Sequence, residues 1–449
     1  MSSYLAAGST SLSFSLPQEL VVIVLCALTA FIAHQALAVF NDGVRPFLLD
    51  FIRGESTRSA TTAVSFGLSA GFIFGLGAPM ALSTGVLNPW LLFLPTDILG
   101  ILAPRKWLAP ILGAAWGAVV VFGLGGANTL AHRLPVDFLT ALQQMSTPIL
   151  FLFALFPVLA ITKQFGRLRG GIAGVVELAL VVATMKLWPK VFAGSIAMAV
   201  GVLMLIGFAA SRDIRQRRAE KADRAAVAAA GPAADDDPMA SLFGASAARL
   251  RRHLPLFMVL GAGVCLLAQM HVFGGGEATS FLIAKHDYSA AAQVDFYRVF
   301  GFIPLIATTA LASGAYGIAG FTLVYPIGYL MPNPWLALIC GALVFAAEVL
   351  LLSRLGRLLS AFPSVRDSSE HLRSAISDTL GLAILFGSLM AANTMGGGLG
   401  VLVVGGLYLL NEAMGRPVVR MAAAPAAVVV GGIVLNVLYW LHLFTPIKG

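Results

Sequence analysis

About a dozen apolar runs, each near the ~20 residues that cross a bilayer as an α-helix, follow one another along this chain. Apolar and polar residues do not alternate within these runs, which argues against a transmembrane β-barrel. Charged residues make up only 11% of the sequence, far below the roughly 25% of soluble domains. The sequence therefore predicts an all-α polytopic membrane protein.

We expect about 12–13 transmembrane helices, because the apolar runs divide into that many segments of suitable length. The predicted spans lie at 19–41, 61–84, 87–103, 107–129, 147–164, 170–187, 191–211, 255–274, 301–325, 334–353, 377–396, 398–412 and 425–444. The segments 87–103 and 398–412 are short, so re-entrant or broken helices are the alternative there. A glycine triplet at 396–398 cannot continue a stable helix and predicts a break.

One long polar segment separates two apolar halves. It covers residues 212–253, begins and ends with arginines, and is too polar to bury a core. Arginines beside span ends are typical of cytoplasmic loops. We therefore expect an N-terminal transmembrane repeat at 1–211, a cytoplasmic linker at 212–253 and a C-terminal transmembrane repeat at 254–449. The net charge of +8 is explained by such basic loops and does not indicate a nucleic-acid partner.

Three tetrapeptide patterns occur once in each half, in the same order. They are Asp-Phe-x-Arg at 50–53 and 295–298, Ala-Thr-Thr-Ala at 60–63 and 307–310, and Asn-Pro-Trp-Leu at 88–91 and 333–336. The copies lie about 245 residues apart. An odd number of predicted spans separates them, which makes the copies antiparallel. The pattern predicts two inverted repeats, an arrangement that many secondary transporters share.

The cysteines and the N-terminus carry no redox or cleavage signal. Cys26, Cys265 and Cys340 lie in apolar runs, without metal-ligand spacing and without a disulfide framework. Residues 1–20 lack the basic region of a cleavable signal peptide, so internal apolar segments would direct insertion into a bacterial inner membrane. We expect neither a metal nor another cofactor.

Four stretches of the chain resemble the YhfT family of bacterial inner-membrane proteins. They are HQALAVFNDGVRP at 34–46, NPWLLFLPTDILGIL at 88–102, PLIATTALASGAYG at 304–317 and NEAMGRP at 411–417. The resemblance extends from about residue 20 to the C-terminus and is weakest in the linker. It implies a transporter of unknown substrate and carries over no binding residue, so sharper expectations depend on the residues themselves.

The repeated patterns supply the candidate substrate-binding residues. An asparagine before Pro-Trp caps a helix, which is either an ordinary transmembrane helix or a half-helix whose N-terminus faces an anionic group. Threonines at the start of small-residue helices bind a polar solute or reflect close helix packing. The arginines attract an anion or lie among lipid headgroups. The candidates are Thr61, Thr62, Asn88, Thr308, Thr309, Asn333, Arg53 and Arg298.

Prolines predict helix breaks in both halves, at 95–97 and beside Pro304. Paired breaks are the best sequence pointer to a transporter site. We expect residues 88–97 of one repeat to approach 304–309 and Asn333 of the other near the midplane and to enclose a hydrated cavity.

Three carboxylic acids within apolar runs are candidate ion-coupling residues. Such a group costs about 2.5–3.5 kcal/mol or more at the bilayer centre, so it must be protonated, paired or in contact with water. The three are Asp97, Glu177 and Glu348. Each is suited to carry a coupling proton or to help bind Na⁺; the alternative is a structural hydrogen bond across a helix pair.

These features favour a secondary active transporter, ion-coupled or facilitative, that moves a small polar solute; the two arginines would suit an anion. No P-loop is present to drive primary transport, and we expect no enzymatic activity. The expected partners are the solute and the lipid bilayer, with a homodimer left open. Two alternatives remain: a membrane-embedded enzyme for a lipid-linked substrate, and a channel-like subunit.

Overall fold

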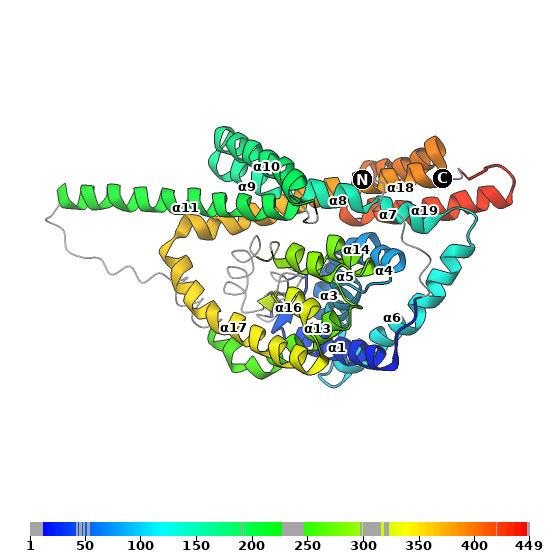
Figure 1. Ribbon diagram of the computed structural model, residues 1–449, viewed down its shortest axis with the longest axis horizontal. Coiled ribbons are helices and arrows are strands. Elements are labelled where there is room, and N and C mark those ends of the chain that lie inside the picture. The colour runs from blue at the N-terminus through cyan, green and yellow to red at the C-terminus, as the bar shows by residue number, and fades with distance from the viewer. Residues whose placement is uncertain are drawn as a thin grey trace.

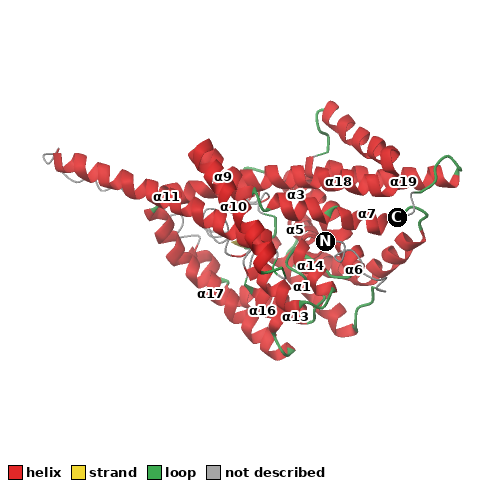
Figure 2. Cartoon of the chain, turned by 45° about the horizontal axis from the view of Figure 1, so that its top comes forward, coloured by secondary structure: helices red, strands yellow, loops and turns green. Residues whose placement is uncertain are grey.

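The computed structural model describes residues 12–41, 54–189, 193–226, 247–296, 323–418 and 420–446, together with the isolated residues 44, 47, 50, 51, 191, 299, 316 and 317. Helices make up nearly all of this part of the chain, and the two strands contain two residues each (Figure 2). The prediction of an all-α protein is confirmed.

Described elements are present in both apolar parts of the sequence. In the first half they are α1 (Leu16–His34), β1 (Ala38–Val39), α3 (Arg58–Phe72), the π-helix η3 (Ile73–Gly77), α4 (Ala78–Thr84), α5 (Pro89–Leu102), α6 (Leu108–Arg133), α7 (Phe138–Gln144), α8 (Ser146–Phe153), α9 (Phe156–Phe165), α10 (Arg167–Leu187) and α11 (Ala193–Ala226). In the second half they are α13 (Leu254–Gln269), α14 (Glu277–Ala284), β2 (Tyr316–Gly317), α16 (Val324–Leu330), α17 (Pro334–Ala361), α18 (Pro363–Ala413) and α19 (Arg420–Trp440).

Seven of the described helices are long and apolar enough to cross a membrane, which confirms a polytopic membrane protein. These spans lie in α1, α6, α10, α11, α17, α18 and α19. The apolar helices α5 and α13 are shorter. With 14 residues, α5 is about 21 Å long, less than the ~30 Å of the hydrocarbon core. The re-entrant alternative for 87–103 therefore fits its observed length.

The predicted glycine break is present in α18. This helix has 51 residues, and its torsion angles leave the helical region at Gly396 and at Gly397, where φ is +55° and ψ is −137°. Glycine adopts positive φ at little cost because it has no Cβ atom. The segments predicted at 377–396 and 398–412 are therefore two arms of one kinked helix.

Two groups of three helices form the centre of the molecule. α1 packs against α5 and α6, and α13 packs against α16 and α17. Gly113 of α6 lies so close to the carbonyl of Cys26 that a Cβ atom would collide with it, and Gly341 of α17 lies in the same way against the carbonyl of Gly261. In Figure 1, α6 and α17 lie on opposite sides of α1 and α13. The two glycine contacts give α6 and α17 matching places in the two groups.

The two helices that begin with Asn-Pro-Trp-Leu pack differently. The two Asn-Pro-Trp-Leu copies begin α5 and α17, whereas the counterpart of α17 in packing is α6. Proline and tryptophan are common where a membrane helix begins, so the tetrapeptide match does not identify equivalent helices.

Two short extended segments connect the groups. β1 pairs in parallel with β2, and a second parallel bridge joins Leu87, just before α5, to Phe273, just after α13. Each crossing segment leaves its helix through a residue with positive φ, Ala36 after α1 (53°) and His271 after α13 (57°). Backbone outside helices thus runs through the buried centre of an otherwise helical protein.

Aromatic rings surround this crossing. The ring centroids of Phe40 and Phe93 lie 4.3 Å apart, those of Phe93 and Phe273 lie 5.4 Å apart, and those of Phe273 and Tyr325 lie 5.6 Å apart. All four side chains are buried. Aromatic ring contacts add roughly 0.5–1.5 kcal/mol per pair beyond the burial of apolar area.

The remaining long helices lie across one side of the central groups (Figure 1). α7, α8, α9 and α19 pack against α18, while α10 packs against α9 and α11. α11 has 34 residues, about 51 Å, and extends beyond the rest of the molecule (Figures 1 and 2). The first part of the predicted linker, residues 212–226, continues this helix.

Candidate functional site

Asp97, in the middle of α5, holds the chain segment that follows β1. Its side chain is buried, and Oδ2 accepts hydrogen bonds from the backbone N–H groups of Phe40 (2.6 Å) and Asn41 (3.1 Å). The Asn41 amide donates in turn to the Ser69 hydroxyl on α3 (3.1 Å). Hydrogen bonds to a carboxylate are stronger than those between neutral groups. Asp97 therefore fixes the junction of α1, α3 and α5.

A second buried carboxylate, Asp295, lies at the junction in the other half. Its Oδ2 accepts a hydrogen bond from the Tyr329 hydroxyl (2.7 Å), which itself accepts one from the backbone N–H of Gly275 (2.7 Å). Gly275 follows the bridge at Phe273 much as Phe40 follows β1. Both junctions thus hold backbone beyond a helix end with an acidic residue, directly in one half and through a tyrosine in the other.

Asn88 and Asn333 both cap helices, as predicted, but in different surroundings. Asn88 is buried; its Oδ1 accepts from the N–H of Leu91 (3.0 Å) and its Nδ2 donates to the carbonyl of Gly77 (2.8 Å) in η3. Asn333 accepts from the N–H of Leu336 (2.9 Å) at the exposed start of α17. Asn88 therefore belongs to the buried crossing, beside a π-helix of the type often found at functional sites.

The helix break predicted at 95–97 is absent. α5 continues through Pro95, and the interruption lies before Asn88 instead. Proline removes the N–H that would bond to the carbonyl four residues earlier, at Leu91. The indole Nε1 of Trp116 on α6 donates to that carbonyl (2.9 Å) and so replaces the missing donor. The neighbouring helix, which the sequence pattern did not reveal, keeps α5 continuous.

Thr61 and Thr62 use their hydroxyl groups within their own helix. Thr61 donates to the carbonyl of Thr57 (3.0 Å), and Thr62 donates to that of Arg58 (2.8 Å). Thr61 is buried, and α3 packs against α5. This arrangement fits the alternative in which these threonines reflect close helix packing.

Glu348 is half-buried on α17 and connects it to the start of α16. Its Oε1 accepts a hydrogen bond from the N–H of Leu323 (3.1 Å), the residue before α16. A carboxylate at a helix N-terminus is stabilised by the free N–H groups and by the helix dipole. This contact joins two helices of the second group.

Glu177 is in a different position. It is 1% exposed, although its neighbours Val175 and Leu178 on α10 are 69% and 66% exposed. Its carboxyl group faces Gly201 of α11 and Pro157 of α9. Within the residues that the structure describes, neither of its oxygens has a hydrogen-bond partner.

The predicted site residues are thus distributed over several places. Asn88 and Asp97 lie at the crossing, Thr61 and Thr62 on the adjacent α3, Asn333 and Glu348 on α17, and Glu177 between α9, α10 and α11. Arg53, Arg298, Thr308 and Thr309 lie outside the described residues. Sequence reasoning did not select Tyr329 or Gly275. The signal for Gly275 was a second glycine triplet, at 274–276, which like 396–398 follows an apolar run.

A polar cluster on the loop side of the second junction contains His271. Its ring stacks on Tyr288 with centroids 3.5 Å apart, and Nε2 lies 3.2 Å from the carbonyl oxygen of Tyr329.

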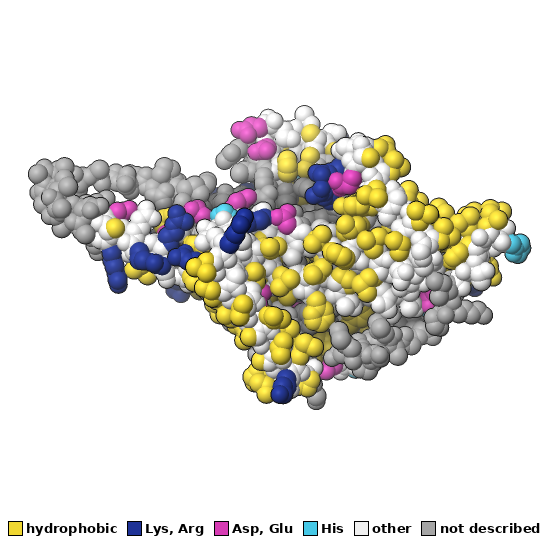
Figure 3. Space-filling view, turned by 90° about the horizontal axis from the view of Figure 1, so that it is seen from above, with side chains coloured by type: hydrophobic (Ala, Val, Ile, Leu, Met, Phe, Trp, Pro, Cys, Tyr) yellow, Lys and Arg dark blue, Asp and Glu magenta, His cyan; other side chains and the backbone are white. Residues whose placement is uncertain are grey.

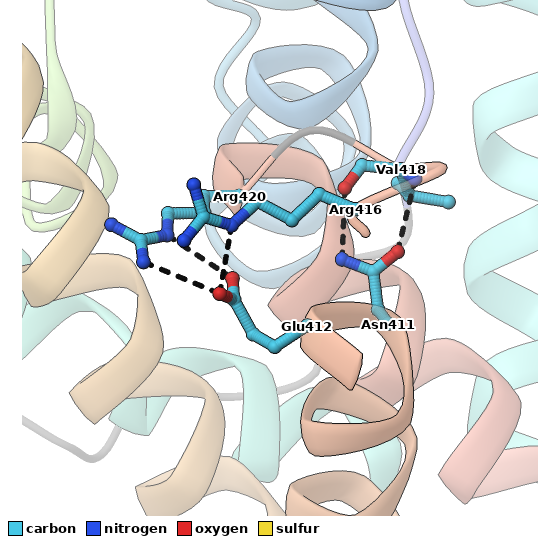
Figure 4. Close-up of polar contacts among 5 residues, drawn as sticks. All are labelled: Asn411, Glu412, Arg416, Val418 and Arg420. Carbon is cyan, nitrogen blue, oxygen red and sulfur yellow. Dashed lines mark hydrogen bonds and ion pairs between the residues drawn. The ribbon is translucent and has the colours of Figure 1, made fainter. Parts of the chain in front are cut away.

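The stretch 411–417 forms a turn between α18 and α19 (Figure 4). Asn411 makes two hydrogen bonds with the backbone of Val418, and Glu412 bonds to the guanidinium groups of Arg416 (2.8 Å) and Arg420 (3.1 Å). The hydrogen bond to Glu412 and the negative charge of that residue raise the pKa of Arg420. Because the Glu412 carboxylate bonds to both arginines across the turn, these contacts indicate that the stretch has a structural role.

The sequence matches one protein family along nearly its whole length. The model of the YhfT family, described as a protein of unknown function, matches residues 18–444. The protein YhfT of Escherichia coli (strain K12), whose name calls it uncharacterized, is 42% identical over 442 residues, which cover 96% of this chain and 99% of that protein. No solved structure matches this chain. Because the match includes both central groups and the helices beside them, this chain belongs to the YhfT family.

Proposed function

We propose that this protein is a secondary active transporter whose solute site is the crossing of the two extended segments. The observation that carries the proposal is the pair of parallel bridges, β1 with β2 and Leu87 with Phe273, in the buried centre. Backbone outside helices is tolerated at membrane depth only inside protein or beside water. Transporters place discontinuous helices at this depth to bind solutes and ions.

The arrangement of helix ends supports the same conclusion. α1 and α13 direct their C-terminal ends toward the crossing segments, and α5 begins there with the buried cap Asn88. A helix N-terminus carries partial positive charge and a C-terminus partial negative charge. The crossing therefore offers binding groups for both signs of charge, which suits a small polar solute.

Inverted repeats are part of the proposal. Three observations support two related halves, one formed around α1 and the other around α13. They are the two parallel bridges, the matching glycine contacts of α6 and α17, and the positive φ at Ala36 and His271. Repeats of opposite orientation would allow one half to close while the other opens, which is the basis of alternating access.

Charge supports a location in the bacterial inner membrane. Lys and Arg side chains gather at the end of the molecule from which α11 extends (Figure 3). Exposed arginines there are Arg212, Arg215, Arg217 and Arg218. Basic residues beside span ends favour the cytoplasmic side, so we place the linker in the cytoplasm. With no P-loop in the sequence, an ion or solute gradient would drive transport, and no catalytic activity is proposed.

The test uses the full chain in proteoliposomes with a panel of small polar metabolites. A solute that raises the melting temperature in detergent should also show saturable uptake. In a variant without Cys26, Cys265 and Cys340, Ser69→Cys at the crossing should react with a small polar thiol reagent and be protected by that solute. Ser388→Cys, equally buried but on α18, is the matched control and should not react.

Other outcomes identify the alternatives. Uptake that does not saturate, without protection of the cysteine, would favour a channel-like subunit. Chemical conversion of a lipid-linked substrate would favour a membrane enzyme. Absence of uptake and of protection for every member of a broad panel would contradict the transporter proposal.

A further inference from the structure

Glu177 belongs to a narrow buried stripe on α10. The buried residues of this helix are Gly170, Ala173, Glu177 and Thr184. Their spacing of three, four and seven residues puts them on one side of a helix. The other side is apolar and exposed, as at Val175 and Leu178, and suits contact with lipid acyl chains. Glu177 is thus the acidic member of an otherwise small-residue contact with α9 and α11.

The carboxyl group fills a space between three helices. A Cβ atom on Gly201 would collide with Oε1 of Glu177, and it would lie only 2.7 Å from Cβ of Pro157. Neither carboxyl oxygen is hydrogen-bonded within the described part of the chain. An ionised carboxylate buried without a partner costs several kcal/mol. The group is therefore stable in this position only when something neutralises it.

The charged side chains of the surrounding helices lie far from Glu177 along their axes. The described charged residues of these three helices that come closest along the chain to Glu177, Pro157 or Gly201 are Arg167, Arg169 and Lys186 on α10, Lys163 on α9, and Arg212 and Asp213 on α11. Lys163 pairs with Asp378 of α18 (2.5 Å), and Asp213 accepts from the N–H of Ser364. Arg212 is eleven residues beyond Gly201, about 16 Å along the helix. These groups do not neutralise Glu177.

A proton suits this position better than a metal ion. Hard cations such as Mg²⁺ and Ca²⁺ take six or more oxygen ligands. Over the residues that the structure describes, no group of three or more His, Cys, Asp and Glu side chains is placed to hold a metal. A lone carboxyl group binds a proton with no further ligand. We propose that Glu177 is the proton-binding site through which a proton gradient drives this protein, an inference that rests on the proposed transport function.

A small displacement of α10 would change the access of water to this proton. α10 packs against α9 and α11 and is otherwise at the surface. Gly201 has no side chain, so no group projects from α11 at this contact. This allows α10 to slide along α11. When the carboxyl group reaches water it releases its proton, and the charged form then resists return to the apolar contact until a proton binds again.

Protonation can be measured without transport. Dicyclohexylcarbodiimide, an apolar reagent, reacts with protonated carboxyl groups in apolar surroundings, and the labelled residue is found by peptide mass spectrometry. We expect labelling of Glu177 that falls as pH rises, because the reagent reacts with the protonated carboxyl group and burial favours that neutral form. Asp378, which is exposed and paired with Lys163, is the internal reference and should stay unlabelled.

Infrared spectroscopy provides the second measurement. The carbonyl stretching band of a protonated carboxyl group should be present in the wild-type protein and lost in Glu177→Gln, which preserves shape. Glu348→Gln, which removes a carboxyl group bonded to Leu323, should retain the band. Absence of both the label and the band at every pH would overturn the proposal.

A transport assay tests whether Glu177 couples proton movement to solute uptake. With a solute from the uptake screen, Glu177→Gln should lose at least tenfold of the uptake driven by a proton gradient and should retain exchange of labelled for unlabelled solute. Uptake unaffected by this substitution would refute coupling through Glu177 while leaving transport established. A protonated Glu177 in a protein that transports no solute would instead count against the proposed function and leave the proton site intact.

Discussion

Gly201 of α11 lies opposite Glu177 of α10 and leaves space for its carboxyl group. A Cβ atom at position 201 would collide with Oε1 of Glu177, and Pro157 closes the same space from α9. Three helices therefore meet through a glycine, an acid and a proline. The size of residue 201 should control both the packing of α10 and the environment of the acid.

Gly201→Ala should destabilise the protein by about 1–3 kcal/mol, because an added methyl group in a filled space forces its neighbours to move. Gly207→Ala, on the same helix, is the matched control, since a Cβ atom there meets nothing within 4 Å. Alanine favours helix over glycine by up to about 1 kcal/mol, so the control should be neutral or stabilising. Thermal unfolding in detergent measures both.

The same pair reports on Glu177 directly. In a Glu177→Ala background the cost of Gly201→Ala should shrink, because one of the two obstructing side chains is gone. Equal costs in both backgrounds would show that Pro157 alone limits the space and that Glu177 does not occupy it.

Asn88→Ala should cost more stability than Asn333→Ala. Loss of a helix cap costs about 0.5–2 kcal/mol. Asn88 also donates to the carbonyl of Gly77, and a buried carbonyl left without a partner adds about 1–3 kcal/mol. Asn333 caps α17 at an exposed position where water can replace it. Equal losses in melting temperature for the two variants would contradict the different surroundings assigned to them.

Several features of the fold follow from the sequence by simple physics. Long apolar runs have to form helices in a bilayer, because every backbone polar group must then be satisfied locally. The break at Gly396 and Gly397 and the caps at Asn88 and Asn333 are also local effects, since each depends on residues adjacent in the chain. Such features were therefore predicted correctly.

Contacts between distant segments were not predictable in the same way. The continuity of α5 through Pro95 depends on Trp116, and the junction at Asp97 depends on Phe40. No local pattern marks either partnership. The two Asn-Pro-Trp-Leu copies begin helices that pack differently, so this short motif did not reveal the packing. Glu177 could be selected from its apolar surroundings, but its contact with Gly201 required the structure.

Gly113→Ala and Gly341→Ala should have similar, large effects. In both cases the new methyl group would meet a backbone carbonyl, of Cys26 or of Gly261, which cannot rotate away as a side chain can. We expect a loss of at least about 1–3 kcal/mol for each, measured by thermal unfolding. Gly123→Ala on α6, where a Cβ atom meets nothing within 4 Å, should be tolerated. A strong effect at only one of the two glycines would contradict matching places for α6 and α17.

Asp97 should prove to be a structural acid, in contrast to Glu177. Asp97→Ala removes the acceptor of two N–H groups, that of the buried Phe40 and that of the half-buried Asn41, and should cost about 1–3 kcal/mol at Phe40 and less at Asn41. Asp97→Asn keeps one oxygen for both bonds and should retain most of the stability, with weaker bonds because the acceptor is neutral. Asp137→Asn, at the exposed cap of α7, is the matched control and should change little, since Asn and Asp cap equally well.

Proton uptake separates the two roles of these acids. On addition of a transported solute to the purified protein, Asp97→Asn should still bind or release protons as the wild type does, because its carboxylate serves the backbone of the α1–α5 junction. Glu177→Gln should abolish this proton exchange while keeping its melting temperature, because no described hydrogen bond is lost. The reverse result, with proton exchange lost in Asp97→Asn and kept in Glu177→Gln, would move the coupling site to the crossing itself.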